Sequence, residues 1–199
     1  MSFQDSIFST KSFTGMFRVL TLFSLFFIFP QLAQATHIVG GEMGYKYLGD
    51  NRFKIFLYVY RDCETGLEGF DDPAYIGMYD GNRQFIKQYN INFVEADTLS
   101  AVVLDECYEI PQPVCVERTL YSFDITASND PVGGKYIFVY QRCCRNEGVQ
   151  NIYEPLETGA AYSIELTKLA IEKGNSTPNF KAWPPTFICL DEQIDFDHS

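Results

Sequence analysis

Histidine and tryptophan are scarce in this chain, and basic residues are outnumbered by acidic ones. The 199 residues include 2 histidines, His37 and His198, and 1 tryptophan. A Ser-His-Asp triad needs a suitably placed histidine base, and zinc sites typically use histidine pairs or Cys-x-x-Cys spacing, none of which the sequence offers. With 15 Lys and Arg against 26 Asp and Glu, the formal charge of −11 argues against nucleic acid or an anionic membrane surface as the main partner.

Long apolar runs are also absent, apart from one near the amino terminus. Lys11 and Arg18 precede an apolar run over residues 19–29, and Ala33-Gln34-Ala35 follows it. This pattern is typical of a cleaved export signal, here residues 1–35, and the run is shorter than the roughly 18 residues that a membrane-spanning helix needs. We therefore expect a secreted or surface-displayed protein that does not span a membrane, with translation starting at Met1 or Met16.

From residue 36 onward, apolar residues alternate in short stretches separated by turn residues, without a long helical period. These stretches predict strands at 38–47, 52–62, 74–79, 84–93, 99–104, 116–126, 135–141 and 161–171. We therefore predict an all-β fold, an immunoglobulin-like antiparallel β-sandwich over residues 36–173. Residues 174–199 contain glycine and several prolines, which predicts a linker followed by the first strand of a truncated repeat.

The six cysteines of an exported chain are expected to form disulfides that staple the sandwich. Cys143 and Cys144 are neighbours at a strand end, so they should point to opposite faces and bond to different partners. Cys143 shares the alternation of Ile137 and Val139, which we take as the core-facing row. Cys63 continues the inward row of Leu57 and Val59, so this alternation predicts Cys63–Cys143 and leaves Cys144 to pair with Cys189. The remaining pair, Cys107–Cys115, would close a small loop.

An acidic loop and a set of strand aromatics are the other candidate binding features. Asp71 and Asp72 follow Gly66 and Gly69 in a loop whose oxygens are of the kind that bind calcium; the alternative is a solvated turn. Aromatic side chains on two strands predict either a sugar- or protein-binding surface or packing against a second layer. These residues are Tyr58, Tyr60, Tyr136, Phe138 and Tyr140. No other metal or cofactor is expected.

Four segments carry a resemblance: residues 35–42 (ATHIVGGE), 59–63 (VYRDC), 69–74 (GFDDPA) and 140–146 (YQRCCRN). Together they resemble the amino-terminal region of large Bacteroidota surface proteins, which are gliding-motility-associated or PKD-repeat adhesin-like substrates of type IX secretion. The resemblance implies a module of a cell-surface protein without catalytic residues. In organisms of that group, Asp97-Thr98-Leu99 also resembles an O-glycosylation site at Thr98.

These observations predict a non-catalytic interaction or structural module of an adhesin-like cell-surface protein, with a surface protein or a glycan as partner. One alternative is a carbohydrate-binding module of a surface hydrolase. The other is a small secreted hydrolase that uses paired carboxylates, since such a pair leaves no short motif. Glycan binding with aromatic variants would distinguish the first alternative, and turnover of polysaccharides the second.

Overall fold

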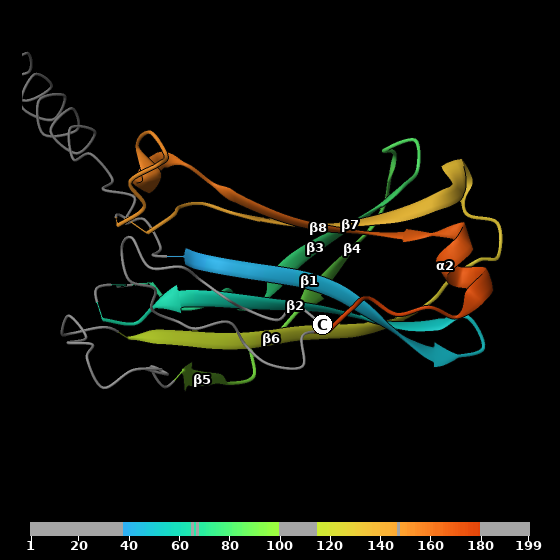
Figure 1. Ribbon diagram of the computed structural model, residues 1–199, viewed down its shortest axis with the longest axis horizontal. Coiled ribbons are helices and arrows are strands. Elements are labelled where there is room, and N and C mark those ends of the chain that lie inside the picture. Colours follow the sequence, from blue (N-terminus) through green and yellow to red (C-terminus); the bar gives the residue numbers. More distant parts are fainter. Residues whose placement is uncertain (1–37, 65, 67, 100–114, 147, 180–199) are drawn as a thin grey trace, which may run out of the picture. The chain divides into compact units, whose positions relative to one another are not determined.

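The structure, a computed structural model, describes residues 38–64, 66, 68–99, 115–146 and 148–179 (Figure 1). The predicted export signal, Cys107, Cys189 and the predicted following repeat lie outside these residues. The described strands are β1 (Ile38–Gly49), β2 (Arg52–Asp62), β3 (Ala74–Asp80), β4 (Phe85–Ile91), β5 (Ala96–Leu99), β6 (Val116–Thr126), β7 (Lys135–Arg142) and β8 (Ala160–Thr167). Two short 3₁₀ turns, Val132–Gly134 and Pro155–Glu157, and the helix α2 (Lys168–Lys173) complete the described elements.

The strands form two antiparallel sheets that face each other. Sheet A has the order β1-β2-β6-β5, and sheet B has the order β4-β3-β7-β8. In the lettering of immunoglobulin domains these orders correspond to A-B-E-D and C′-C-F-G. Figure 1 shows β1, β2, β6 and β5 in one layer, with β7 and β8 in the other. The predicted all-β sandwich is therefore confirmed.

Strict alternation of side chains builds the core between the two sheets. Every second residue of β2 from Phe53 to Val59 is fully buried, and Phe138 and Tyr140 are the buried residues of β7. Aromatic contacts join the layers, as where Tyr89 of β4 stacks on Phe123 of β6 with ring centroids 4.1 Å apart. Of the five aromatics considered for a surface, Phe138 and Tyr140 thus belong to the core.

The other three of those aromatics are half-buried. Tyr136 packs against the core cluster. Tyr58 and Tyr60 alternate with the buried residues of β2 and therefore lie on the outer face of sheet A. The aromatic residues of β7 therefore pack in or against the core, whereas those of β2 lie at the surface.

The last predicted strand is shorter than expected. β8 ends at Thr167, and the next six residues form α2 instead of continuing as a strand to Ile171. The Thr167 hydroxyl accepts a hydrogen bond from the Ala170 amide at 3.2 Å, and Gly174 ends the helix in the left-handed conformation with φ 59°. The helix buries Ala170 and Ile171, so these apolar residues reach the core from a helical turn.

The first residues of the predicted linker pair with sheet A. The Thr177 amide donates to the Tyr45 carbonyl at 2.9 Å, and the Tyr45 amide donates to the Thr177 hydroxyl at 3.2 Å. The Tyr47 amide likewise donates to the Ser176 hydroxyl at 3.0 Å. This segment covers part of the edge of β1, so the folded region continues beyond the predicted boundary at residue 173.

Candidate functional site at one end of the sandwich

Three of the segments that carry the resemblance meet at one end of the sandwich. Residues 59–63 end β2, residues 69–74 lead into β3, and residues 140–146 end β7. The start of β6 lies at the same end, because β6 pairs antiparallel with β2. We call this region the motif end and define it as residues 61–64, 68–72, 115–117 and 140–146.

Asp71 is the centre of the motif end and contacts both sheets. Tyr140 of sheet B donates its hydroxyl to Asp71 Oδ2 at 2.6 Å, and Tyr121 of sheet A donates its hydroxyl to the Asp71 carbonyl at 2.7 Å. Arg142 lies 3.3 Å from Asp71 Oδ1 through Nη1 and donates to the Gly69 carbonyl through Nη2 at 2.7 Å. The loop before β3 is thereby fixed across the end of the core.

Burial and the neighbouring carboxylate affect both tyrosines in the same direction. Burial raises the pKa of Tyr140, and its hydrogen bond to Asp71 and the charge of that carboxylate raise the pKa further, against a smaller lowering by Arg142. Burial also raises the pKa of Tyr121, with the Asp71 charge as the second cause. Both hydroxyls therefore stay protonated donors at neutral pH.

Arg61 organises the other half of the motif end. Its Nε donates to Glu117 Oε2 at 2.9 Å, and its Nη2 lies 2.8 Å from the same oxygen. Nη1 donates to the Glu68 carbonyl at 2.7 Å, and the guanidinium lies over the Phe70 ring at 5.4 Å. Phe70 in turn stacks on Phe93 with centroids 5.8 Å apart. Charge pairing and ring stacking thus hold the 68–70 loop on sheet A.

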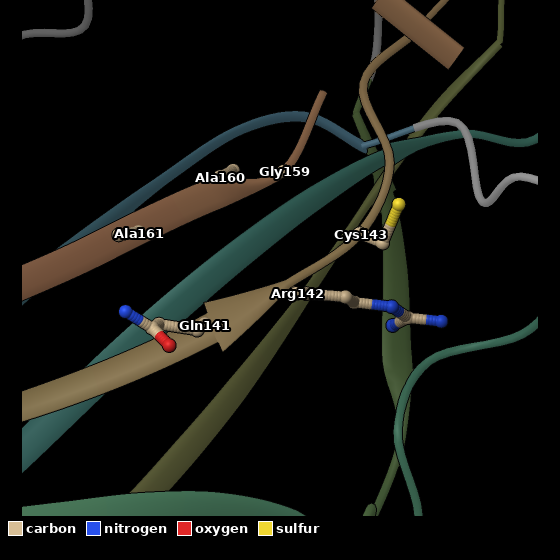
Figure 2. A pocket seen from close by; sticks show the side chains of 6 residues that line it. All are labelled: Gln141, Arg142, Cys143, Gly159, Ala160 and Ala161. Carbon is tan, nitrogen blue, oxygen red and sulfur yellow. The ribbon is translucent and has the colours of Figure 1, made fainter. Parts of the chain in front are cut away.

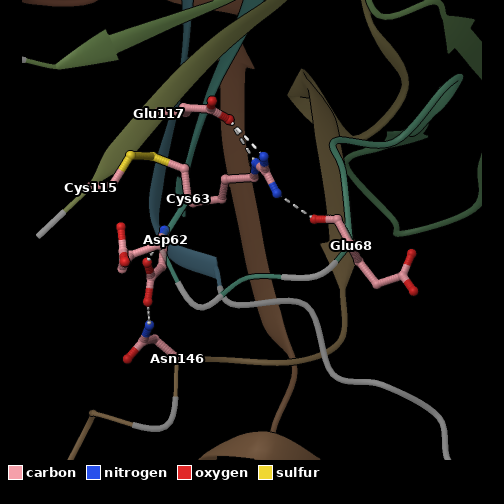
Figure 3. Close-up of a disulfide and its surroundings, with 8 residues drawn as sticks. Asp62, Cys63, Glu68, Cys115, Glu117 and Asn146 are labelled. Carbon is pink, nitrogen blue, oxygen red and sulfur yellow. Dashed lines mark hydrogen bonds and ion pairs between the residues drawn. A yellow bond between two sulfur atoms is a disulfide. The ribbon is translucent and has the colours of Figure 1, made fainter. Parts of the chain in front are cut away.

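Cys63 is bonded to Cys115, not to Cys143 as the alternation predicted (Figure 3). The register of β2 and β6 places Asp62 opposite Val116, so the two cysteines face each other at the next position, with Cα atoms 5.1 Å apart. The predicted pairing is wrong because it took the wrong row of β7 as inward. Cys143 shares the alternation of Ile137 and Val139, whereas the buried row is that of Phe138 and Tyr140.

Cys143 and Cys144 are bonded to each other. Strand alternation does not govern them because β7 ends at Arg142. The predicted pairs Cys144–Cys189 and Cys107–Cys115 are therefore wrong as well, since Cys144 and Cys115 have other partners.

The segment after these cysteines anchors the start of β1. The backbone amide of Asn146 donates to the Ile38 carbonyl at 3.1 Å, and the backbone amide of Ile38 donates to the Cys144 carbonyl at 3.4 Å. Asn146 Nδ2 also donates to Asp62 Oδ2 at 2.9 Å, as Figure 3 shows. The carboxyl end of β2, the segment after β7 and the first described residue of β1 are thus joined by hydrogen bonds.

A shallow hollow of about 340 Å³ lies beside this network, between the ends of β7 and β8. Its lining residues are Gln141, Arg142, Cys143, Gly159, Ala160 and Ala161. The small residues of β8 and of the position before it leave this space open. Figure 2 shows Gln141 and Arg142 pointing to opposite sides of β7, so the amide reaches the outer face of sheet B while the guanidinium reaches the Asp71 loop.

The predicted calcium residues point to different partners. Asp71 accepts from Tyr140, whereas Asp72 Oδ1 accepts from the Phe93 amide at 3.0 Å. Within the described part of the chain, no three Asp, Glu, His or Cys side chains are grouped as a metal site. Calcium binding by this loop stays a prediction. Thr98 is exposed on the edge strand β5, opposite Glu117 in register, and its glycosylation stays a prediction as well.

Arg61 and Arg142 are not among the site residues predicted from the sequence, although the strand pattern contains a signal for them. Arg61 continues the inward row of Leu57 and Val59, and Arg142 continues that of Phe138 and Tyr140. A charged residue at the end of an inward row must find a counter-charge or several acceptors, because burying an unpaired charge is costly. That requirement points to Glu117, Asp71 and the loop carbonyls as partners.

Comparison with known proteins gives no match: no protein-family model, curated protein or solved structure is significantly similar to this chain. No helix among the described residues is long and apolar enough to cross a membrane. The two disulfides are compatible with an extracellular protein, since disulfides persist in oxidising compartments.

Proposed function

We propose that this chain is a non-catalytic interaction or structural module of an exported, adhesin-like cell-surface protein. The observation that carries the proposal is the use of charged groups at the motif end. Asp62, Asp71 and Glu117 each accept hydrogen bonds from defined donors, and those bonds join segments far apart in the sequence. An active site of paired carboxylates instead needs acids set around a space for substrate.

The arrangement suits a domain that must keep its shape among neighbouring domains. Asp71 joins a loop to both sheets, and the disulfide between Cys63 and Cys115 closes a chain separation of 52 residues within sheet A. The export pattern and the resemblance of the same segments to Bacteroidota surface proteins favour the cell surface as the place where this stability is used.

Turnover assays on the exported full chain test the proposal. We expect no hydrolysis of polysaccharide or peptide panels above the background of a matched Asp71→Asn preparation, with both proteins checked for folding by circular dichroism. Hydrolysis by the wild type that disappears in a folded Asp71→Asn or Asp62→Asn variant would overturn the proposal in favour of a carboxylate hydrolase.

A further inference from the structure

The outer face of sheet B presents aromatic side chains that the core does not use. Tyr75 of β3 is 54% exposed and Phe85 of β4 is 60% exposed. Among the described aromatic residues, the only other exposed one is Tyr153, at 84%. Tyr75 and Phe85 lie on neighbouring strands of one sheet, whereas Tyr153 lies in the loop between β7 and β8.

The register of the sheet defines the composition of this surface. Tyr75 lies opposite Asn90, and Gly77 lies between Gln88 and Val139. Tyr79 lies between Phe85 and Ile137. We call this surface the Tyr79 face: Tyr75, Gly77, Tyr79, Phe85, Gln88, Asn90, Val139 and Gln141. At Gln141 the face adjoins the hollow beside the motif end.

The Tyr79 ring lies against Gly77, a position without a side chain. A Cβ at Gly77 would lie 2.9 Å from Tyr79 Cε2 and 3.2 Å from its hydroxyl oxygen, so the ring occupies the space that a side chain would fill. Phe85 supports the ring edge-on, with centroids 5.7 Å apart and planes at 71°. One side of the Tyr79 ring therefore lies against the Gly77 backbone, and the side chain as a whole is half-buried.

Apart from the two tyrosine hydroxyls, the polar side chains of the Tyr79 face are amides. Gln88 Nε2 donates to Asn90 Oδ1 at 2.8 Å, which holds both exposed side chains in place beside Tyr75 and Gly77. Amides offer donors and acceptors together, as the hydroxyl groups of a sugar require. The nearest ion pair across β7 and β8, Lys135 to Glu165 at 2.7 Å, lies at the rim of the face and is neutral as a pair.

The aromatic rings on the outer face of sheet A have different partners. There the Arg118 guanidinium covers the Tyr58 ring at 5.3 Å, and Tyr60 donates its hydroxyl to Glu42 at 3.1 Å. Those rings are half-buried, as Tyr79 is, but they differ from Tyr79 in being engaged with charged side chains. Sheet B therefore offers the better surface for an uncharged ligand with a flat apolar face.

We propose that the Tyr79 face binds a neutral carbohydrate chain. The C–H-rich face of a pyranose ring fits the negative face of a flat aromatic ring, and the hydroxyls at its edge fit the amides of Gln88, Asn90 and Gln141. An acidic polysaccharide is disfavoured by the formal charge of −11. This inference rests on the proposed function, because it names the ligand class of the interaction module.

Affinity electrophoresis of the exported full chain provides the test. Native gels contain soluble β-glucan, xylan or mannan as neutral probes, and alginate as the acidic comparison. Tyr79→Thr removes the platform, Gly77→Ala displaces the ring without removing an aromatic atom, and Tyr153→Thr is the matched control on an exposed tyrosine elsewhere. Circular dichroism confirms that each variant is folded.

At least one neutral polysaccharide is expected to retard the wild type and the Tyr153→Thr variant, with roughly tenfold weaker binding by Tyr79→Thr, weaker binding by Gly77→Ala, and no retardation by alginate. Failure of every neutral probe to retard the folded wild type would overturn the carbohydrate assignment. So would equal binding by Tyr79→Thr, or a concentration-dependent dimer in sedimentation that Tyr79→Thr abolishes. None of these results involves turnover, so the non-catalytic proposal is judged separately by its own assay.

Discussion

The motif end and the Tyr79 face use their side chains in different ways. At the motif end the Arg142 side chain is 10% exposed and bound to Asp71 and Gly69, and Tyr140 is 1% exposed with its hydroxyl on Asp71. On the Tyr79 face, Tyr75 is 54% exposed and stands beside amides at the surface.

This difference is expected if the motif end serves stability and the Tyr79 face serves the proposed carbohydrate binding. Polar contacts at the motif end hold loops and strands together, so substitutions there should change the free energy of unfolding. Substitutions of the exposed side chains of the Tyr79 face, such as Tyr75, should leave that free energy almost unchanged, because exposed side chains contribute little to folding.

Among changes at the motif end, removing the disulfide between Cys63 and Cys115 should lower the free energy of unfolding the most. Replacing both cysteines by alanine should lower the free energy of unfolding by about 4 kcal/mol, because a bridge over a separation of 52 residues constrains much of the unfolded chain. Denaturant unfolding followed by circular dichroism measures the change. Replacing both Cys143 and Cys144 is the control and should cost much less, since neighbouring residues close almost no loop. Equal losses would contradict the bonding described here.

Removing the charge of Asp71 is the next largest perturbation. Asp71→Asn should cost about 3 kcal/mol, because Arg142 would remain largely buried without its counter-charge. The matched control is Asp124→Asn, whose partner Lys54 lies 3.7 Å away with both side chains about half exposed. Asp124→Asn should change the free energy of unfolding by no more than about 0.5 kcal/mol. Equal denaturation midpoints for the two variants would show that the Asp71 network adds nothing to stability.

Alkaline pH should weaken the contacts of Asp71 with Tyr121 and Tyr140. The pKa values of Tyr121 and Tyr140 are raised in the folded protein, so folding keeps their protons bound where the unfolded chain releases them. Their contribution is complete below about pH 10, the ordinary tyrosine pKa, and is lost as the pH rises above it. Above about pH 10, each of the two tyrosines should lower the free energy of unfolding by up to about 1.4 kcal/mol for every further pH unit.

Replacing both tyrosines by phenylalanine isolates this pH dependence. The double variant should be less stable than the wild type at neutral pH yet lose stability more slowly above about pH 10. Denaturant midpoints across the alkaline range, together with the ultraviolet absorbance of tyrosinate, provide the measurement. Parallel stability curves for variant and wild type would show that these hydroxyls do not resist ionisation.

Alternation of side chains allowed most of the fold to be predicted from the sequence. β2 and β6 have their predicted limits, 52–62 and 116–126, because both strands combine clear alternation with clear ends. Alternation failed at the end of β8, where the helix signals of Thr167 and Gly174 lie next to a strand with the same apolar residues.

The sites depend on which strands are neighbours, and alternation contains no such information. The partner of Cys63 follows from the pairing of β2 with β6, which places Cys115 opposite it. The platform at Tyr79 likewise depends on the ring folding back over Gly77 and on Phe85 of the adjacent strand. The inward row of β7 alone would have indicated that Arg142 needs an acidic partner.

The smallest expected effect completes the comparison between the two regions. Tyr75→Thr removes a whole ring from the Tyr79 face but introduces a residue that favours strands. The free energy of unfolding should therefore change by no more than about 0.5 kcal/mol. Tyr140→Phe removes a single oxygen atom from the motif end and should cost about 2 kcal/mol, because it removes a hydrogen bond to the Asp71 carboxylate. Denaturant unfolding of the two variants side by side tests this order. If removing the ring at Tyr75 costs as much as removing the oxygen at Tyr140, the Tyr79 face is part of the folding core rather than a surface kept for a ligand.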